Sequence, residues 1–144
     1  MLKKFIGLLL QVAIMTYEAV VIGTSAGGLA ALSAILPSLP EDFPLPILIV
    51  QHMAPNKESY LSAHLDQLSR IRVKEADDKE PIEPGRVYLA PGGYHLLIEN
   101  DHSLSLSSDD RVCYSRPSID VLFECAADVF REHLIGIVLT GANN

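Results

Sequence analysis

Short, nearly unbroken apolar runs alternate along the chain with segments in which apolar residues recur every three or four positions. The apolar runs are rich in Val, Ile and Leu, which is typical of strands covered on both faces. These strands are expected at 18–23, 45–51 and 134–140. Helices are expected at 26–36, 57–69 and 118–132, with Ser118 as the N-cap of the last one. Strands that alternate with helices predict parallel βαβ units joined by right-handed crossovers.

Between the second and third helices the pattern changes to short segments that alternate apolar and polar residues. We expect strands at 71–75 and 86–90, then a half-exposed β-hairpin formed by 94–99 and 103–107. No repeat, low-complexity tract or interdomain linker interrupts the chain. The pattern as a whole predicts an α/β fold, a three-layer α/β/α sandwich with a mostly parallel sheet and an inserted β-hairpin.

The first 14 residues differ from the rest. Two lysines near Met1 precede an apolar run over 5–14, as in a signal peptide, but the run is too short to span a bilayer as a helix. No small-x-small cleavage site follows, and the chain continues directly into the first strand. We therefore interpret 1–14 as an N-terminal extension, with Met15 as an alternative start. A secretory signal remains the other interpretation. Residues 15–144 form the expected domain, a common size for a single domain.

Charge and cysteine content exclude several classes of function. The formal net charge is −7 and the pI is near 5.1, which argues against a nucleic-acid partner because phosphate binding needs clustered Lys and Arg. Cys113 and Cys125 form neither a disulfide framework nor a Cys-x-x-Cys metal motif, and no histidine pair has zinc-site spacing. We expect no metal and no cofactor, and we expect Cys125 to be a buried, unreactive thiol.

The segment 23–28, between the first strand and the first helix, is the strongest candidate for chemistry. It fits G-x-S-x-G, a pattern that exposes a serine, here Ser25, on a tight and strained strand-to-helix turn. The helix start offers N–H groups to a developing oxyanion. A dinucleotide-binding G-x-G-x-x-G fails because Ser25 takes the place of its second glycine, and no P-loop lysine follows. From this segment alone, hydrolase chemistry, anion or nucleotide binding and a purely structural turn all stay open.

His52 strengthens the hydrolase interpretation. It directly follows the second buried strand, so it is expected at the carboxyl edge of the sheet, beside Ser25. Ligands of open α/β sheets gather at that edge, where we expect the loops 23–28, 51–56 and 141 onward to converge. A serine hydroxyl needs a positioned base such as imidazole to act as a nucleophile. The alternative is a histidine whose ring is satisfied by loop carbonyls.

Two further residues are weaker candidates. His95 comes from the glycine-rich loop 90–95. Its side chain could line the active-site cleft, and the sequence leaves open whether it does. Arg116 precedes the last helix, where it either clamps a substrate carboxylate or phosphate or serves as a surface ion pair or carbonyl cap. Asp120, in the first turn of that helix, is expected to interact favourably with the positive end of the helix dipole. His133 is expected to do the same at the negative, C-terminal end.

Five segments together resemble the CheB methylesterase domain, and they occur in the order found in that family. They are VVIGTSAGG at 20–28, VQHM at 50–53, LAPGGYH at 89–95, RPSIDVLF at 116–123 and IVLTG at 137–141. The resemblance implies Ser25 as nucleophile and His52 as general base and then acid. It also implies oxyanion or substrate contacts from Ala26, Gly27, His95, Arg116, Gly141 and Ala142. The implied substrates are glutamyl methyl esters, and glutamines to be deamidated, on the cytoplasmic helices of chemoreceptors. The resemblance therefore also implies that the protein is cytoplasmic and does not insert into a membrane.

The chain departs from the family pattern in three ways. The family's catalytic aspartate follows the Leu-Thr-Gly loop by a few residues, whereas this sequence ends at Asn144, so the C-terminal segment is expected to be missing. Because the acid of a triad orients the imidazole, its loss lowers turnover by about 10⁴-fold. Ala142 replaces a methionine common in the family. No receiver domain precedes Met15, so a stand-alone protein without phosphorylation control in cis is expected. A methylesterase-like binding module without turnover and a nucleotide-binding domain remain the alternatives.

Overall fold

A five-stranded parallel sheet forms the centre of the molecule in the computed structural model, which describes residues 4, 8, 16–52, 59–113 and 115–139. The strand order is β3-β4-β2-β1-β7, and every neighbouring pair is parallel. The strands are β1 (Ala19–Thr24), β2 (Ile47–Gln51), β3 (Arg72–Glu75), β4 (Arg86–Leu89) and β7 (Leu134–Leu139). The alternation of apolar runs and helical segments predicted this parallel arrangement.

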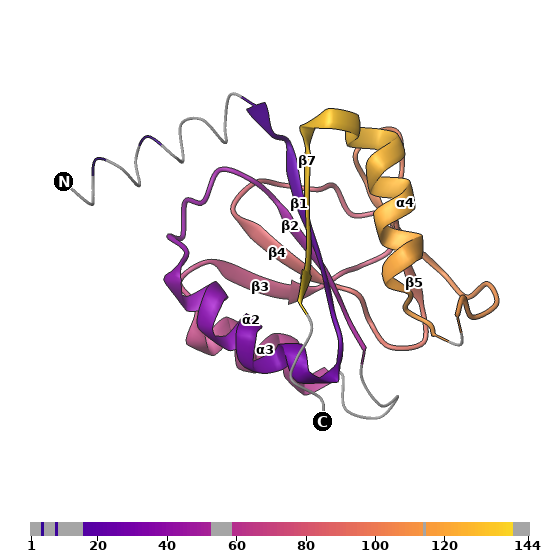
Figure 1. The fold of residues 1–144 in the computed structure, drawn as a ribbon, viewed down its shortest axis with the longest axis horizontal. Coiled ribbons are helices and arrows are strands. Elements are labelled where there is room, and N and C mark those ends of the chain that lie inside the picture. The colour runs from indigo at the N-terminus through magenta and orange to yellow at the C-terminus, as the bar shows by residue number, and fades with distance from the viewer. Residues whose placement is uncertain (1–3, 5–7, 9–15, 53–58, 114, 140–144) are drawn as a thin grey trace.

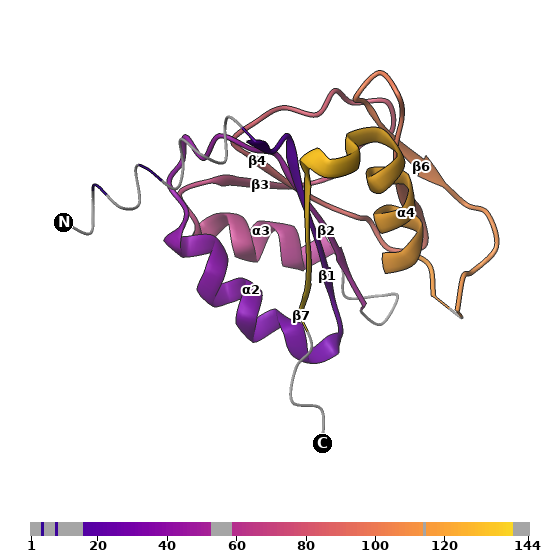
Figure 2. The same cartoon turned by 45° about the horizontal axis from the view of Figure 1, so that its top comes forward.

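Helices cover both faces of the sheet, as Figures 1 and 2 show. One face carries α2 (Leu29–Ile35) and α3 (Ser59–Leu68). The other carries α4 (Ile119–Phe130) and an antiparallel hairpin of β5 (His95–Ile98) and β6 (Leu104–Ser107). Short 3₁₀ turns η1 (Ala26–Gly28), η2 (Leu36–Ser38) and η3 (Arg131–His133) join the elements. The predicted three-layer sandwich with an inserted hairpin is confirmed.

The two faces of each central strand feed two separate hydrophobic clusters, because alternate side chains of a strand point to opposite faces. Val20 and Ile22 of β1 pack with Leu32 of α2 and Leu65 of α3. Ala19 and Val21 of the same strand pack in the second cluster. Its other members include Leu122, Ala126 and Phe130 of α4 and Leu96, Ile98 and Leu104 of the hairpin. Full burial of one such Leu or Ile contributes about 1.5–3 kcal/mol, so these contacts fix both layers.

The expected burial of the last strand is wrong. Among the described residues, β7 is the edge strand of the sheet and pairs only with β1. Val138 is 62% exposed and the other apolar side chains of β7 are half-buried. The apolar run correctly predicted a strand, but an apolar pattern does not specify strand order and so cannot tell an edge strand from a central one.

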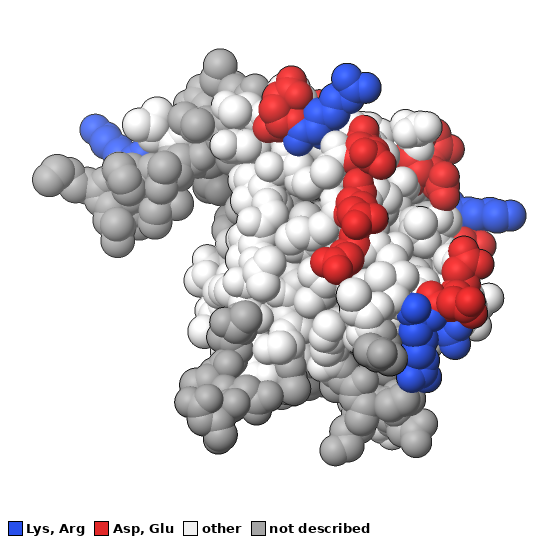
Figure 3. All heavy atoms as spheres, turned by 45° about the vertical axis from the view of Figure 1, so that its right-hand side comes forward, with Lys and Arg blue, Asp and Glu red and all other residues white. Residues whose placement is uncertain are grey.

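The outer face of α4 is acidic. Asp120, Glu124 and Asp128 are exposed at four-residue intervals along the helix, and Figure 3 shows acidic side chains following one another on this side of the molecule.

Two further predictions concern α4. Ser118 occupies the N-cap position as expected, but its side chain makes no capping hydrogen bond. Cys125 lies on the inner side of α4, where burial raises the pKa of its thiol. The residue is only partly buried, short of the full burial that was expected, and its low reactivity stays a prediction.

The predicted N-terminal extension lies outside the described residues except for Lys4 and Leu8. In the part of the chain that the structure describes, no helix combines the length and apolar character needed to cross a bilayer.

Candidate active site

Ser25 and His52 follow two residues that are register partners on adjacent strands. Thr24 of β1 pairs with Gln51 of β2 as the last pair of the ladder. The His52 N–H donates to the Thr24 carbonyl oxygen at 3.0 Å. Because the strands are parallel, both chains leave the sheet at the same carboxyl edge. The structure therefore brings Ser25 and His52 to neighbouring positions, as the sequence pattern predicted.

The backbone at Ser25 is held on both sides. Its N–H donates to the carbonyl oxygen of Leu139, the last residue of β7, at 3.3 Å. Its carbonyl oxygen accepts a hydrogen bond from Gly28 N–H at 2.8 Å, which closes η1. The backbone angles are φ −82° and ψ 177°, an ordinary extended conformation. The expected strain in this turn is thus wrong for Ser25 itself.

Close packing, rather than unusual backbone angles, explains two glycines around the serine. A Cβ at Gly23 would lie 2.5 Å from Ile119 Cγ2 of α4. A Cβ at Gly28 would lie 2.6 Å from Thr24 Cβ and 3.3 Å from the Leu139 carbonyl oxygen. Both positions favour a residue without a side chain, because α4 approaches β1 closely at Gly23 and η1 approaches β1 and β7 closely at Gly28.

His52 is half-buried and contributes to the wall of a pocket. Its Nε2 is shielded from solvent and has no hydrogen-bond partner within the described residues. Buried imidazole nitrogens are normally hydrogen-bonded, so this nitrogen still has a hydrogen bond to make, as a general base in a resting site would. Among the described residues, no loop carbonyl accepts a hydrogen bond from this nitrogen.

The pocket beside His52 has a volume of about 290 Å³. Its wall mixes apolar side chains with hydroxyl, thiol and carboxylate groups. The lining residues besides His52 are Val112, Cys113, Ser115, Ser118, Ile119, Asp120 and Val138. They come from the segment before α4, the first turn of α4 and the end of β7, so the pocket opens at the carboxyl edge on the α4 side. Asp120, expected only to favour the helix dipole, also lines this pocket.

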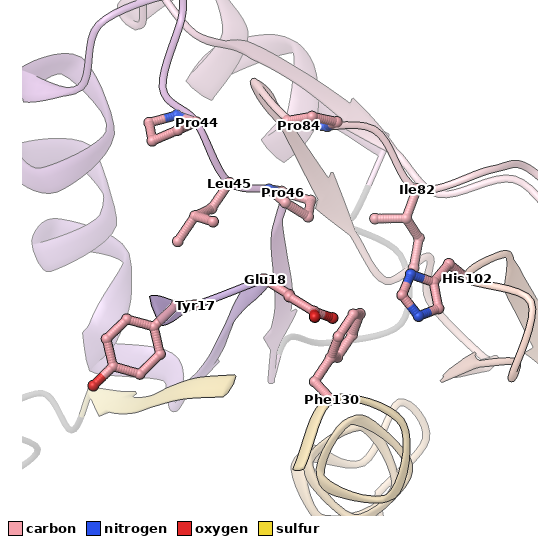
Figure 4. Close-up of a pocket in the computed structure, with 9 residues that line it drawn as sticks. All are labelled: Tyr17, Glu18, Pro44, Leu45, Pro46, Ile82, Pro84, His102 and Phe130. Carbon is pink, nitrogen blue, oxygen red and sulfur yellow. The ribbon is translucent and has the colours of Figure 1, made fainter. Parts of the chain in front are cut away.

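A slightly larger pocket, of about 320 Å³, lies at the opposite, amino-terminal edge of the sheet. Figure 4 shows Glu18, Pro46, Ile82, His102 and Phe130 among its walls. Its described lining residues include no Ser, Cys or Thr beside its histidine. Since ligands of open α/β sheets bind beyond the carboxyl ends of the strands, the pocket at His52 is the candidate site. Ser25 itself is not among the residues that line it.

His95 and Arg116 support the segment that forms one wall of this pocket. His95 is 2% exposed, and its Nε2 contacts the carbonyl oxygen of Asp110 at 2.9 Å. Arg116 Nη1 donates to the carbonyl oxygens of Ser108 and Asp109 at 2.8 and 3.2 Å. Neither residue lines the 290 Å³ pocket. The substrate contacts implied for them stay predictions, and the carbonyl-capping alternative for Arg116 is the contact that the structure displays.

The remaining predicted site residues divide into two groups. Ala26 and Gly27 form η1 directly after Ser25, where their N–H groups are candidates for an oxyanion contact. Gly141 and Ala142, with loop residues 53–56, lie outside the described residues. Across the part of the chain that is described, no three His, Cys, Asp or Glu side chains gather in a way that could hold a metal ion.

Sequence reasoning missed Gln51, Ser118, Cys113 and Val138. Gln51 carried a visible signal, because it is the one polar residue in the apolar run 45–51. Ser118 and Val138 lie in the family-like segments 116–123 and 137–141. No pattern marks them or Cys113 as lining a pocket, since that depends on how α4 and β7 meet.

Comparison with known proteins decides the family. A sequence model described as CheB methylesterase matches residues 20–144. The chain belongs to the CheB methylesterase family. The resemblance first indicated by the five segments is therefore confirmed, and membership in a methylesterase family does not favour the non-enzymatic alternative.

Individual CheB methylesterase relatives support this assignment. A Leptospira interrogans protein is 53% identical over 130 residues, which are 90% of this chain and 67% of that protein. Proteins named protein-glutamate methylesterase/protein-glutamine glutaminase from Symbiobacterium thermophilum and Thermotoga maritima are 44% and 41% identical. Each match covers 85% of this chain but only 34% and 36% of those proteins. The crystal structure of the Thermotoga maritima CheB methylesterase catalytic domain superposes with a TM-score of 0.82 at 41% identity. That superposition covers 87% of this chain and 68% of the crystal chain.

Proposed function

We propose that this chain is the catalytic unit of a serine hydrolase that removes methyl groups from esterified glutamates and deamidates glutamines on chemoreceptor helices. The placement of Ser25 and His52 directly after the register partners Thr24 and Gln51 carries the proposal. The names of the Symbiobacterium and Thermotoga relatives supply the reaction. Because the proposed substrates are the cytoplasmic helices of chemoreceptors, the proposal also implies that the reaction takes place in the cytoplasm.

The reaction follows from what each group does. His52 takes the hydroxyl proton of Ser25, and Ser25 Oγ attacks the side-chain carbonyl carbon of the substrate. The carbonyl oxygen becomes an oxyanion near the N–H groups of Ala26 and Gly27. Methanol leaves with the proton from His52, or ammonia leaves when the substrate is glutamine. Water then attacks the acyl-enzyme with His52 as base, which releases glutamate and restores Ser25.

The shielded Nε2 of His52 is the nitrogen that we assign to this proton transfer, because it has no hydrogen-bond partner among described residues and its ring lines the pocket. Asp120 lines the same pocket. Its carboxylate favours a neutral ester or amide over the anionic glutamate that the reaction forms, since like charges at close range repel. The pocket is therefore suited to the two proposed substrates and to release of their common product.

The test is methanol release from a peptide that contains γ-methyl glutamate, by the protein as its gene encodes it. Ser25→Ala and His52→Gln should each lower the rate by at least about 10³-fold. Ser33→Ala is the matched control, because Ser33 lies on α2, away from the strand ends. This variant should keep the wild-type rate. Retention of most of the activity in Ser25→Ala would refute the proposal.

A further inference from the structure

We propose that Gln51 is a positioning residue for the hydrolysis proposed above, on which this inference rests. Its side-chain amide joins the main chains of Ser25 and His52. Gln51 is the last residue of β2 and is 8% exposed. Its Nε2 donates to the carbonyl oxygen of Ser25 at 2.8 Å and to that of His52 at 3.2 Å. One amide group thus contacts the backbone of both residues that carry the chemistry.

The orientation of this amide is fixed by its surroundings. The Thr24 hydroxyl donates to Gln51 Oε1, and Thr24 is fully buried. A rotated amide would place its oxygen against the carbonyl oxygens of Ser25 and His52, neither of which can donate, so these partners select one orientation. Thr24 therefore holds Gln51, and Gln51 holds the two carbonyls.

The amide also replaces a rung of the strand ladder. The ladder between β1 and β2 runs up to the hydrogen bond from His52 N–H to Thr24. In a continued parallel ladder, the next bond would run from the Ala26 N–H to the His52 carbonyl oxygen. Ala26 begins η1 instead, and Gln51 Nε2 supplies the donor to His52.

This replacement has a consequence for catalysis. The first N–H groups of a helical turn have no partner inside the turn. With the His52 carbonyl satisfied by Gln51, the Ala26 N–H is not required by the ladder, and it can serve the oxyanion proposed above. Gln51 therefore holds the two main chains at a fixed spacing and keeps a donor available, without touching the substrate.

The experiment compares four variants with the wild-type protein in methyl-ester hydrolysis. Gln51→Met keeps the length of the side chain and removes its donors, so kcat should fall by about 10- to 100-fold while KM changes little, as expected for misplaced reacting groups. Thr24→Val should lower kcat by a smaller factor. Thr24→Ser keeps the hydroxyl and should have the wild-type kcat. Gln67→Met makes the same chemical change at an exposed position of α3 and should leave both constants unchanged.

A second measurement separates positioning from general damage to the fold. A peptide boronate forms a tetrahedral adduct with the serine, so its inhibition constant should rise by the same factor by which kcat/KM falls. Equal kcat in Gln51→Met and wild type would overturn the inference. If Gln51→Met does not fold, the Thr24 pair decides: the inference fails if Thr24→Val matches Thr24→Ser. Parallel assays of Ser25→Ala keep the two claims apart, because an active alanine variant would refute the proposed function instead.

Discussion

Ile119 of α4 stands directly over Gly23 of β1, where a Cβ on the glycine would lie 2.5 Å from Ile119 Cγ2 and 3.0 Å from its Cγ1 and Cδ1. Ile119 also lines the pocket beside His52. The absence of a side chain at position 23 therefore sets how closely the pocket wall approaches the strand that ends just before Ser25.

Substitution at this contact should destabilise the protein in a way that a second substitution reverses. Gly23→Ala should lower the free energy of unfolding by about 1–3 kcal/mol, as overpacking of a tight contact does. Ile119→Ala removes all three clashing atoms and costs about 1–3 kcal/mol on its own for a half-buried side chain. The double variant should lose clearly less than the sum of the two single losses, as measured by urea unfolding.

Ile119→Val is the control for that cycle, because valine keeps both Cγ atoms and so retains the clash. Gly23→Ala should therefore not be relieved by Ile119→Val. Strict additivity of Gly23→Ala with Ile119→Ala would show that the two side chains do not meet as the structure indicates.

The two cysteines should differ sharply in reactivity, and modification of one should inhibit the enzyme. Cys113 is exposed and lines the pocket beside His52. Cys125 is partly buried, with its thiol pKa raised by burial, and has less thiolate available. A bulky maleimide should therefore label Cys113 first and lower ester hydrolysis by about tenfold or more, a barrier increase of at least about 1.4 kcal/mol. Mass spectrometry of the labelled protein and a rate assay measure both effects.

Cys113→Ser should protect the activity from the same reagent. Full activity after complete labelling of Cys113 would mean that the substrate does not use this pocket.

His133 should make stability depend on pH near neutrality. Its Nδ1–H donates to the Thr16 carbonyl oxygen at 2.8 Å, and this bond, with the nearby Glu132 and Glu18 charges, raises the pKa of the imidazole from 6.5. A raised pKa in the folded state means that the protonated ring favours folding. The contribution is complete below pH 6.5 and is lost as the pH rises through the folded-state pKa.

Melting temperatures from pH 5.5 to 8.5 for the wild type and His133→Asn measure this effect. Asparagine keeps a donor but does not titrate, so the advantage of the wild type should shrink above pH 6.5. A difference that is constant over the whole range would contradict this role of His133.

Sequence patterns predicted most of the fold because each element has its own periodicity. They also predicted that Ser25 and His52 share an edge, because parallel strands end on the same side of a sheet. They did not predict that β7 is the edge strand among the described residues, since strand order depends on long-range packing. Gln51, His95 and Arg116 lie in the family-like segments, and carbonyl capping is one of the alternatives for Arg116. Their contacts are directed at main-chain carbonyls, and a sequence motif does not show which carbonyl a side chain contacts. Ser118 and Val138 line the pocket only because the fold brings the start of α4 close to the end of β7.

Reaction with a fluorophosphonate tests the central claim most directly, because this reagent forms a covalent bond only with an activated serine. The adduct is located by mass spectrometry in the wild type, in Ser25→Ala and in His52→Gln. A single adduct on Ser25 is predicted, absent from Ser25→Ala and formed far more slowly in His52→Gln. An adduct on a different serine, or unchanged labelling of the alanine variant, would contradict the account.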